Sequence, residues 1–127
     1  MLTPFEVAKH ALFALSDKKA KDIKMLRTFD VTTLADYFII ATATSSTHLK
    51  TLSDEVEKHL KECGENQLRR EGHRSGDWIL LDYGCLIVHL FMQEAREFYT
   101  LERIWSDAED VDISTIVDIA SRAGHLN

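Results

Sequence analysis

Two short, apolar, β-rich segments constrain the fold of this chain more than any other feature. Residues 37–42 read Tyr-Phe-Ile-Ile-Ala-Thr, and residues 85–91 read Cys-Leu-Ile-Val-His-Leu-Phe. β-branched and aromatic residues favour extended backbone, so each segment is expected to form a strand, with 37–42 in the centre of a sheet. Both segments are far too short to span a bilayer, so no membrane association is expected.

Three further segments carry apolar residues at helical spacing. The first begins with a capping box from Thr3 to Glu6, has Pro4 at its first position, and ends near residues 17–19. The second begins among the cap candidates at 44–47 and ends at Gly64; the third covers residues 94–105. The residues expected to be buried are Ala8, Ala11, Leu12 and Leu15 in the first helix, Leu49, Leu52, Val56, Leu60 and Cys63 in the second, and Ala95, Phe98, Leu101 and Trp105 in the third.

Alternating segments add strands at residues 22–27, 67–71 and 77–82, and Tyr83-Gly84 is expected to close a tight hairpin. The order is then helix, strand, strand, helix, short strand, strand, strand, helix. Helices that alternate with pairs of strands predict a single α/β domain, in which a mixed sheet is flanked by helices. An α+β arrangement stays open as the alternative.

The domain is expected to occupy residues 1–106, because 127 residues suffice for one hydrophobic core. Residues 107–127 are expected to form an acidic C-terminal tail. Within this tail, Ile113, Ile116, Val117 and Ala120 have the spacing of a short amphipathic helix, and disorder is the alternative. The charged residues of the tail are Asp107, Glu109, Asp110, Asp112, Asp118 and Arg122.

The formal net charge is -6, from 21 acidic and 15 basic residues. Binding to nucleic acid by phosphate neutralisation draws on clustered Lys and Arg, so no direct sequence-specific nucleic-acid binding is expected. An acidic protein can still bind a ribonucleoprotein through one of its basic proteins. The N-terminus lacks the features of a secretory signal or transit peptide, and we expect a cytoplasmic protein.

The sequence contains no Gly-rich phosphate loop, dinucleotide fingerprint or zinc-protease helix. Asp77 and Asp82 flank one strand, point to opposite faces and are better explained as turn residues than as a metal site. Cys63 and Cys85 are expected to be buried, reduced thiols, since neither has a His or Cys partner at ligand spacing. His89 lies in an apolar strand and is expected to be a core or interface group. We therefore expect no catalytic residue, metal or cofactor.

Large amphipathic residues gather between residues 78 and 105. Trp78, Tyr99 and Trp105 lie among charged residues that include Glu94, Arg96 and Glu102. Trp, Tyr and Arg are enriched at the energetic centres of protein interfaces. These aromatics either anchor a partner or fill the core between the hairpin and the last helix, and sequence alone leaves both interpretations open.

Residues 77–84, 87–91 and 94–105 together resemble the signature block of the Iojap, or ribosomal silencing factor, family. Residues 36–42 and 45–49 are similar to its second strand and the start of its second helix. The resemblance runs from about residue 4 to residue 106. Two positions depart from the family pattern: Ala43 stands where glycine is common, and Cys85 stands where aspartate is common.

The resemblance implies an α/β fold related to nucleotidyltransferases but without their catalytic carboxylates, and therefore a protein that is not an enzyme. It implies binding to the large ribosomal subunit through ribosomal protein L-fourteen. Bound there, the protein would block association with the small subunit and repress translation under nutrient limitation. Relatives in mitochondria and chloroplasts are tied to large-subunit biogenesis, so an assembly role stays open.

The resemblance also suggests roles for the gathered side chains. Trp78 and Tyr99 are the expected hydrophobic anchors, and Glu94 and Glu102 would meet basic groups of the ribosomal protein. Arg96 would orient these carboxylates through a bidentate pair. His89 and Trp105 are expected to be structural or interface residues.

Two other functions compete with ribosome binding. One is a small nucleotidyltransferase with an unrecognised carboxylate set, which would bind nucleotide in the presence of metal. The other is a homodimeric adaptor without a ribosomal role. Exposed Trp and Leu residues would favour a homodimer in the free protein under either interpretation, so dimerisation does not discriminate between them.

Overall fold

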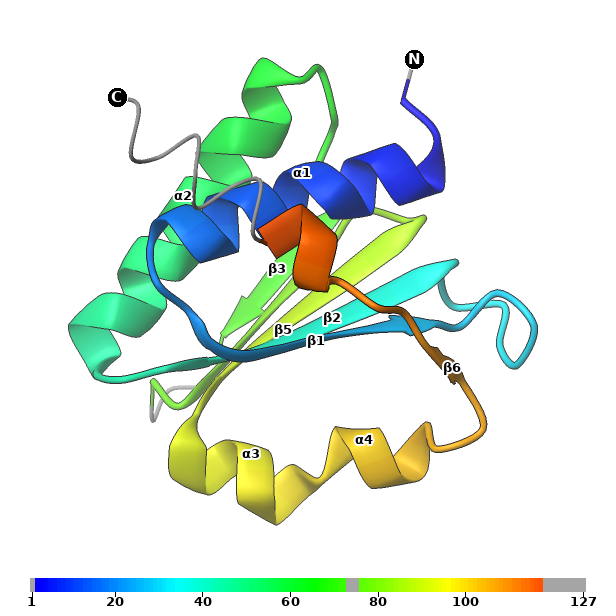
Figure 1. Ribbon diagram of the computed structural model, residues 1–127. Helices are drawn as coiled ribbons and strands as arrows, with labels where there is room; N and C mark the ends of the chain where they lie inside the picture. Colours follow the sequence, from blue (N-terminus) through cyan, green and yellow to red (C-terminus); the bar gives the residue numbers. More distant parts are fainter. Residues whose placement is uncertain (1, 73–75, 118–127) are drawn as a thin grey trace.

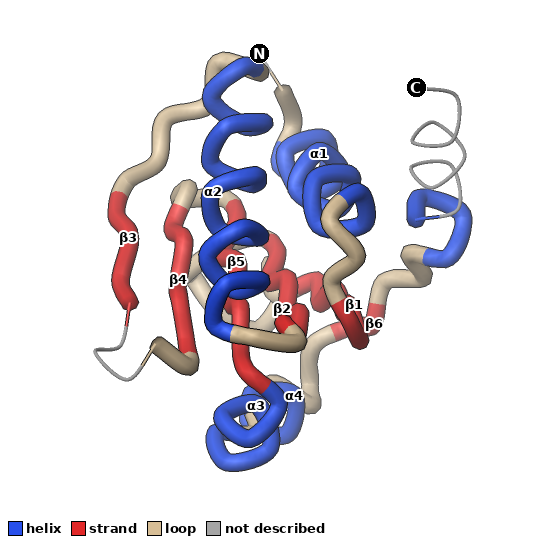
Figure 2. Tube along the Cα trace, turned by 90° about the vertical axis from the view of Figure 1, so that its left-hand side faces the viewer, coloured by secondary structure: helices blue, strands red, loops and turns tan. Residues whose placement is uncertain are grey.

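The computed structural model describes residues 2–72 and 76–117 (Figure 1). A six-stranded sheet separates two helical layers (Figures 1 and 2). The elements, in chain order, are α1 (Pro4–Asp17), β1 (Lys21–Arg27), β2 (Tyr37–Ala43), α2 (Ser46–Glu62), β3 (Arg69–Gly72), β4 (Trp78–Asp82), β5 (Leu86–Met92), α3 (Gln93–Tyr99), α4 (Leu101–Ile104) and β6 (Glu109–Asp110). The predicted α/β domain with a mixed, helix-flanked sheet is confirmed.

The strand order is β3-β4-β5-β2-β1-β6. The two apolar segments of the sequence lie side by side at its centre, where β2 and β5 pair in parallel from Tyr37–Leu86 to Ala43–Met92. All the other pairs are antiparallel. β2 and β5 are buried along nearly their whole length, as strands covered on both faces should be.

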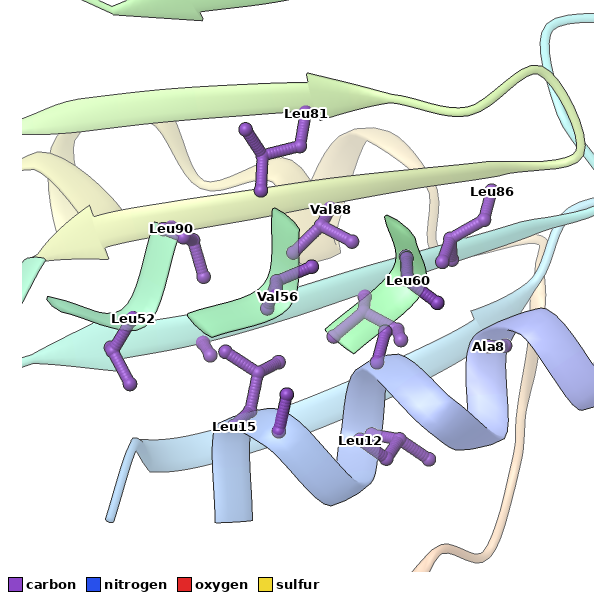
Figure 3. Close-up of a cluster of buried hydrophobic side chains, with 14 of the residues drawn as sticks. Ala8, Leu12, Leu15, Leu52, Val56, Leu60, Leu81, Leu86, Val88 and Leu90 are labelled. Atoms are coloured by element: carbon purple, nitrogen blue, oxygen red, sulfur yellow. The ribbon is translucent and has the colours of Figure 1, made fainter. Parts of the chain in front are cut away.

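Helices α1 and α2 lie together on one face of the sheet and enclose the larger core (Figures 2 and 3). Its side chains come from one stripe on each helix and from alternate positions on the strands, the arrangement that helical and strand periodicities require. They include Ala8, Leu12 and Leu15 of α1, Leu52, Val56 and Leu60 of α2, and Leu81, Leu86, Val88 and Leu90 of the strands.

Helix starts follow the predicted caps. Thr3 Oγ1 accepts the Glu6 N–H at 3.2 Å, and a Glu6 carboxylate oxygen accepts the Thr3 N–H at 3.0 Å, which completes the capping box. Ser45 caps α2 by accepting the His48 N–H at 3.0 Å. Gly64, with φ of 86°, follows α2 in the left-handed conformation that helix ends favour.

The expectation of one helix over residues 94–105 is wrong. The helix ends at Tyr99, and Thr100 adopts left-handed φ and ψ of 46° and 50° before α4 begins. The change of direction carries Trp105 back under the sheet, with its ring centroid 5.2 Å from that of Phe38. Phe98, expected to be buried, is 80% exposed, because Ala95 and Tyr99 take the sheet-facing side of α3.

Two smaller expectations also change. Cys63 and Cys85 are free thiols, as predicted, but both are half-buried rather than buried. Ala43 ends β2 as a buried residue in ordinary extended backbone, so the glycine common in the family is not needed there.

Part of the segment after residue 106 is described. β6 pairs antiparallel with β1 through Asp110–Leu26 and Glu109–Arg27. Residues 114–117 form one helical turn, and Ile113 and Ile116 pack against the larger core. Asp118, Ala120 and Arg122, the rest of the expected tail, lie outside the described residues.

The left-handed residue between α3 and α4 yields a stability prediction. A β-branched residue with positive φ is strained, so Thr100→Gly should raise the free energy of unfolding by about 1 kcal/mol in urea denaturation. Thr51→Gly, at an exposed position inside α2, is the matched control and should lower it slightly, by about 0.3 kcal/mol. A loss of stability in Thr100→Gly would contradict the strain at this junction.

Candidate functional site

The second face of the sheet is only partly covered, by α3 and α4 (Figure 1). α3 starts directly after β5, so its position is fixed by the central strand that precedes it. Ala95 is the buried residue of α3, and no residue of α4 is buried. This layer is therefore thin, and most of its residues are exposed or half-buried.

An aromatic cluster lies between this layer and the sheet. Trp78 lies at the centre, with its ring centroid 4.8 Å from Tyr99, 5.2 Å from Phe91 and 5.9 Å from His89. Phe38 connects His89, at 5.4 Å, to Trp105 on the other side. The structure thus brings together four residues that the sequence singled out: Trp78, His89, Tyr99 and Trp105.

Burial in this cluster shows how far each aromatic residue belongs to the core. Trp78, Tyr99 and Trp105 are half-buried, whereas Phe38 and Phe91 are fully buried. The half-buried rings pack against the core with one part and face outward with another. They shape the surface and belong to the core at the same time.

Arg96 is tied into the fold. Its side chain is 11% exposed, and its Nε donates to Glu102 at 3.2 Å. One terminal nitrogen donates to the hydroxyl of buried Thr42 at 2.8 Å and to the carbonyl of Asp22. Asp22 has a φ of 47° in the irregular stretch of β1, so Arg96 joins α3 to this stretch. Among the described residues, the contact of Arg96 with Glu102 is a single one through Nε, and not the expected bidentate pair.

Sequence reasoning missed two exposed apolar side chains on this layer. Phe98 of α3 is 80% exposed and Ile104 of α4 is 64% exposed. Phe98 meets Tyr99 edge to face, with ring centroids 5.1 Å apart. The adjacent aromatic pair was the available signal, because two consecutive helical residues cannot both face the same sheet.

Carboxylates surround these apolar groups on α3 and α4. Glu94 and Glu97 are exposed on α3, and Glu102 of α4 is half-buried in its pair with Arg96. Glu97 accepts a hydrogen bond from Gln93 at 2.8 Å, and Arg103 is an exposed cation next to Glu102. The layer therefore offers apolar side chains beside the two exposed carboxylates of α3, while the Arg96–Glu102 pair and Arg103 make its charge mixed.

The two aspartates considered for a metal site bracket β4 at its ends. Asp82 accepts the Gly84 N–H at 2.8 Å within the hairpin turn and pairs with Arg69 at 3.2 Å. The carbonyl of Asp77 accepts the Met92 N–H at 2.9 Å. Both residues act where strands begin or end, as turn residues should.

Buried His89 is an uncharged member of the cluster. Burial lowers its pKa from 6.5 to about 4, and within the described part of the chain its Nδ1 has no hydrogen-bond partner. A neutral imidazole packed against Trp78 and Phe38 serves packing and is poorly suited to act as a proton-transfer group near neutral pH.

The fold and this surface define a single α/β domain whose thin helical layer carries exposed aromatic and charged side chains. The family model described as "Ribosomal silencing factor during starvation" matches residues 2–125. The chain belongs to the ribosomal silencing factor family, whose members associate with the ribosome, and the resemblance noted from residues 77–105 is confirmed.

Individual relatives agree with this assignment. A ribosomal silencing factor of Chromobacterium violaceum is 40% identical over 100 residues, covering 79% of this chain and 82% of the relative. A crystal structure of a protein from that organism superposes with a TM-score of 0.80 at 38% identity, covering 83% of this chain and 88% of the other. The mouse protein named "Mitochondrial assembly of ribosomal large subunit protein 1" is 33% identical over 95 residues, 72% of this chain and 42% of its own length.

Among the described residues, no helix combines the length and the apolar character needed to cross a membrane.

The depressed pKa of His89 predicts acid sensitivity. The unfolded chain takes up a proton near pH 6.5, whereas the native state resists protonation down to about pH 4. The stability due to neutral His89 is therefore complete above pH 6.5 and is lost as pH falls to about 4, by about 3 kcal/mol. Urea denaturation should show that the free energy of unfolding of wild type falls, relative to that of His89→Leu, as pH is lowered from 6.5 to 4. A difference independent of pH would show that His89 titrates normally.

Proposed function

We propose that this protein represses translation by binding the large ribosomal subunit through ribosomal protein L-fourteen and sterically blocking the small subunit. The observation that carries the proposal is the α3–α4 face, where exposed Phe98 and Ile104 lie among carboxylates. Ribosomal proteins are basic, so an acidic face around apolar anchors complements them in charge. The family description, which refers to starvation, supports repression under nutrient limitation.

Blocking of subunit joining needs occupancy of a surface and no chemical step. The net charge of -6 favours encounter with a basic protein by long-range attraction. Desolvated apolar side chains at the centre of the contact would then hold the complex. The half-buried aromatic cluster supports such a contact, because side chains that are already ordered lose little conformational entropy when they bind.

The proposed contact residues fall into two groups. Phe98 and Ile104 project from the layer, while Trp78 and Tyr99 pack behind it and present only part of their rings. Glu94 and Glu102 would meet basic groups of the ribosomal protein. Arg96 contributes indirectly, because it holds Glu102 and fixes α3 to the sheet.

Assistance in large-subunit assembly is a second candidate function. It is favoured by the mouse relative, whose name refers to assembly of the mitochondrial large subunit. One docking site on the large subunit would serve both functions. They separate experimentally, because silencing acts on mature subunits and assembly requires precursors.

Phe98 permits a clean test of the proposed face. Because its side chain is 80% exposed, Phe98→Ala should change the free energy of unfolding by no more than about 0.5 kcal/mol. It should weaken co-sedimentation with purified large subunits at least about tenfold, as the loss of an interface anchor does. It should also raise the protein concentration needed to inhibit joining of the two subunits in light scattering.

Leu68→Ala is the matched control, because Leu68 is 68% exposed but precedes β3, at the far edge of the sheet. This variant should bind large subunits and inhibit joining like wild type. Sedimentation of the free proteins tests the homodimer alternative: a shift toward monomer in Phe98→Ala, with unaltered ribosome binding, would assign the face to self-association. Failure of the wild type to sediment with large subunits would refute the proposed function.

A further inference from the structure

Three potential metal ligands converge on the helical layer opposite α3 and α4. His10 lies on α1, His59 lies on α2, and Cys63 is the C-cap residue of α2. One ligand atom from each lies within 4.8 Å of the other two. Within residues 2–72 and 76–117, this is the only group of three or more His, Cys, Asp or Glu side chains that meets this criterion.

The fold creates this cluster in two steps. His59 and Cys63 are four residues apart, which places both on one side of α2. α1 packs beside α2 (Figure 2). This packing brings His10 against His59, so that His10 Nδ1 and His59 Nε2 are 3.1 Å apart. The expectation that neither cysteine has a partner at ligand spacing is wrong for Cys63, because the helical i, i+4 relation to His59 is such a spacing.

The two histidine nitrogens are close to the separation that a bound ion would impose, and the Cys63 sulfur lies within 4.8 Å of both. Two nitrogens held at 2.0–2.1 Å by a tetrahedral zinc ion lie about 3.3 Å apart. The histidine nitrogens, at 3.1 Å, need to separate only slightly. Without metal, one ring donates its N–H to the other. An ion bound to both facing lone pairs requires that proton to move to the far nitrogen of its ring.

The electrostatic surroundings favour metal binding at His10 more than at Cys63. Burial lowers the pKa of His10, and the neighbouring His59 lowers it further, so the imidazole is neutral and able to bind metal. Burial, followed by Glu62 and Glu65, raises the pKa of Cys63, so its thiol must release a proton when an ion binds. The same carboxylates attract a cation to the half-exposed cluster.

We propose that His10, His59 and Cys63 form a Zn²⁺ site with a fourth, open position for water. Imidazole nitrogen and thiolate sulfur are ligands that favour zinc over Mg²⁺ or Ca²⁺. Bound zinc would join α1 to α2 and stabilise the packing of this layer. The site lies across the sheet from Phe98 and Ile104, so the proposal is independent of ribosome binding.

Cobalt and zinc titrations of the full chain under reducing, metal-free conditions test the site. Co²⁺ is the optical probe, because tetrahedral Co²⁺ absorbs strongly in the visible range and thiolate ligation adds a near-ultraviolet charge-transfer band. We expect one Co²⁺ per chain with both features, displaced by one Zn²⁺. We also expect the melting temperature to rise about 5–10 °C when free Zn²⁺ exceeds its Kd a hundredfold.

Variants of each ligand have a matched control in the second thiol. Cys63→Ser should abolish the charge-transfer band, and His10→Gln and His59→Gln should weaken Co²⁺ binding at least about tenfold. Cys85→Ser should retain the spectrum and affinity of wild type, since Cys85 lies apart from the cluster. Circular dichroism without metal checks that each variant folds.

Three results would overturn the proposal. The first is a wild type that binds less than one Co²⁺ or binds it without the thiolate band. The second is equal loss of the band in Cys85→Ser and Cys63→Ser. The third is a zinc-induced rise in melting temperature that survives in folded Cys63→Ser and His59→Gln.

Discussion

The parallel pairing of β2 with β5 is the constraint on which the rest of the structure depends. Seven consecutive residues of each strand pair in register, and both strands are buried on both faces. Parallel neighbours need a crossover, which the chain makes through α2 and the β3–β4 hairpin. The residues following β2 and β5 then emerge at the same end of the sheet. α2 turns to one face and α3 to the other, so this pair determines where both helical layers begin (Figure 2).

The two layers differ because they bury different amounts of apolar surface. α1 and α2 each present a full stripe to the larger core, which makes their layer the stabilising one. α3 and α4 contribute a single buried residue, Ala95, and their fixed position relies on the aromatic cluster and on Arg96. The outer side chains of this thin layer, among them Phe98 and Ile104, are not needed to hold it in place and are the ones that we propose contact the ribosome. Under the proposed function, the layer that stabilises the fold and the layer that binds the partner would lie on opposite sides of the sheet.

Local patterns in the sequence predicted most of the fold. The capping box at Thr3, the strand pattern around Ile39 and the turn at Gly84 act over a few residues, so the sequence displays them directly. Tertiary contacts decided the rest. The break at Thr100 depends on Trp105 reaching Phe38, and the cluster of His10 with His59 depends on how two distant helices pack. Tertiary contacts also limit prediction of the candidate surface. Trp78 and Tyr99 could be singled out from the sequence as candidates, but Phe98 was expected on the buried side of its helix and is exposed.

Hydrogen–deuterium exchange with and without purified large ribosomal subunits tests the central claim most directly, because it reports on every layer of the unmodified protein at once. The account predicts that binding slows exchange in α3 and α4, across residues 93–104, and leaves α1 and α2 unchanged. Protection confined to α1 and α2, with α3 and α4 exchanging as in the free protein, would contradict the assignment of the α3–α4 face to the ribosome.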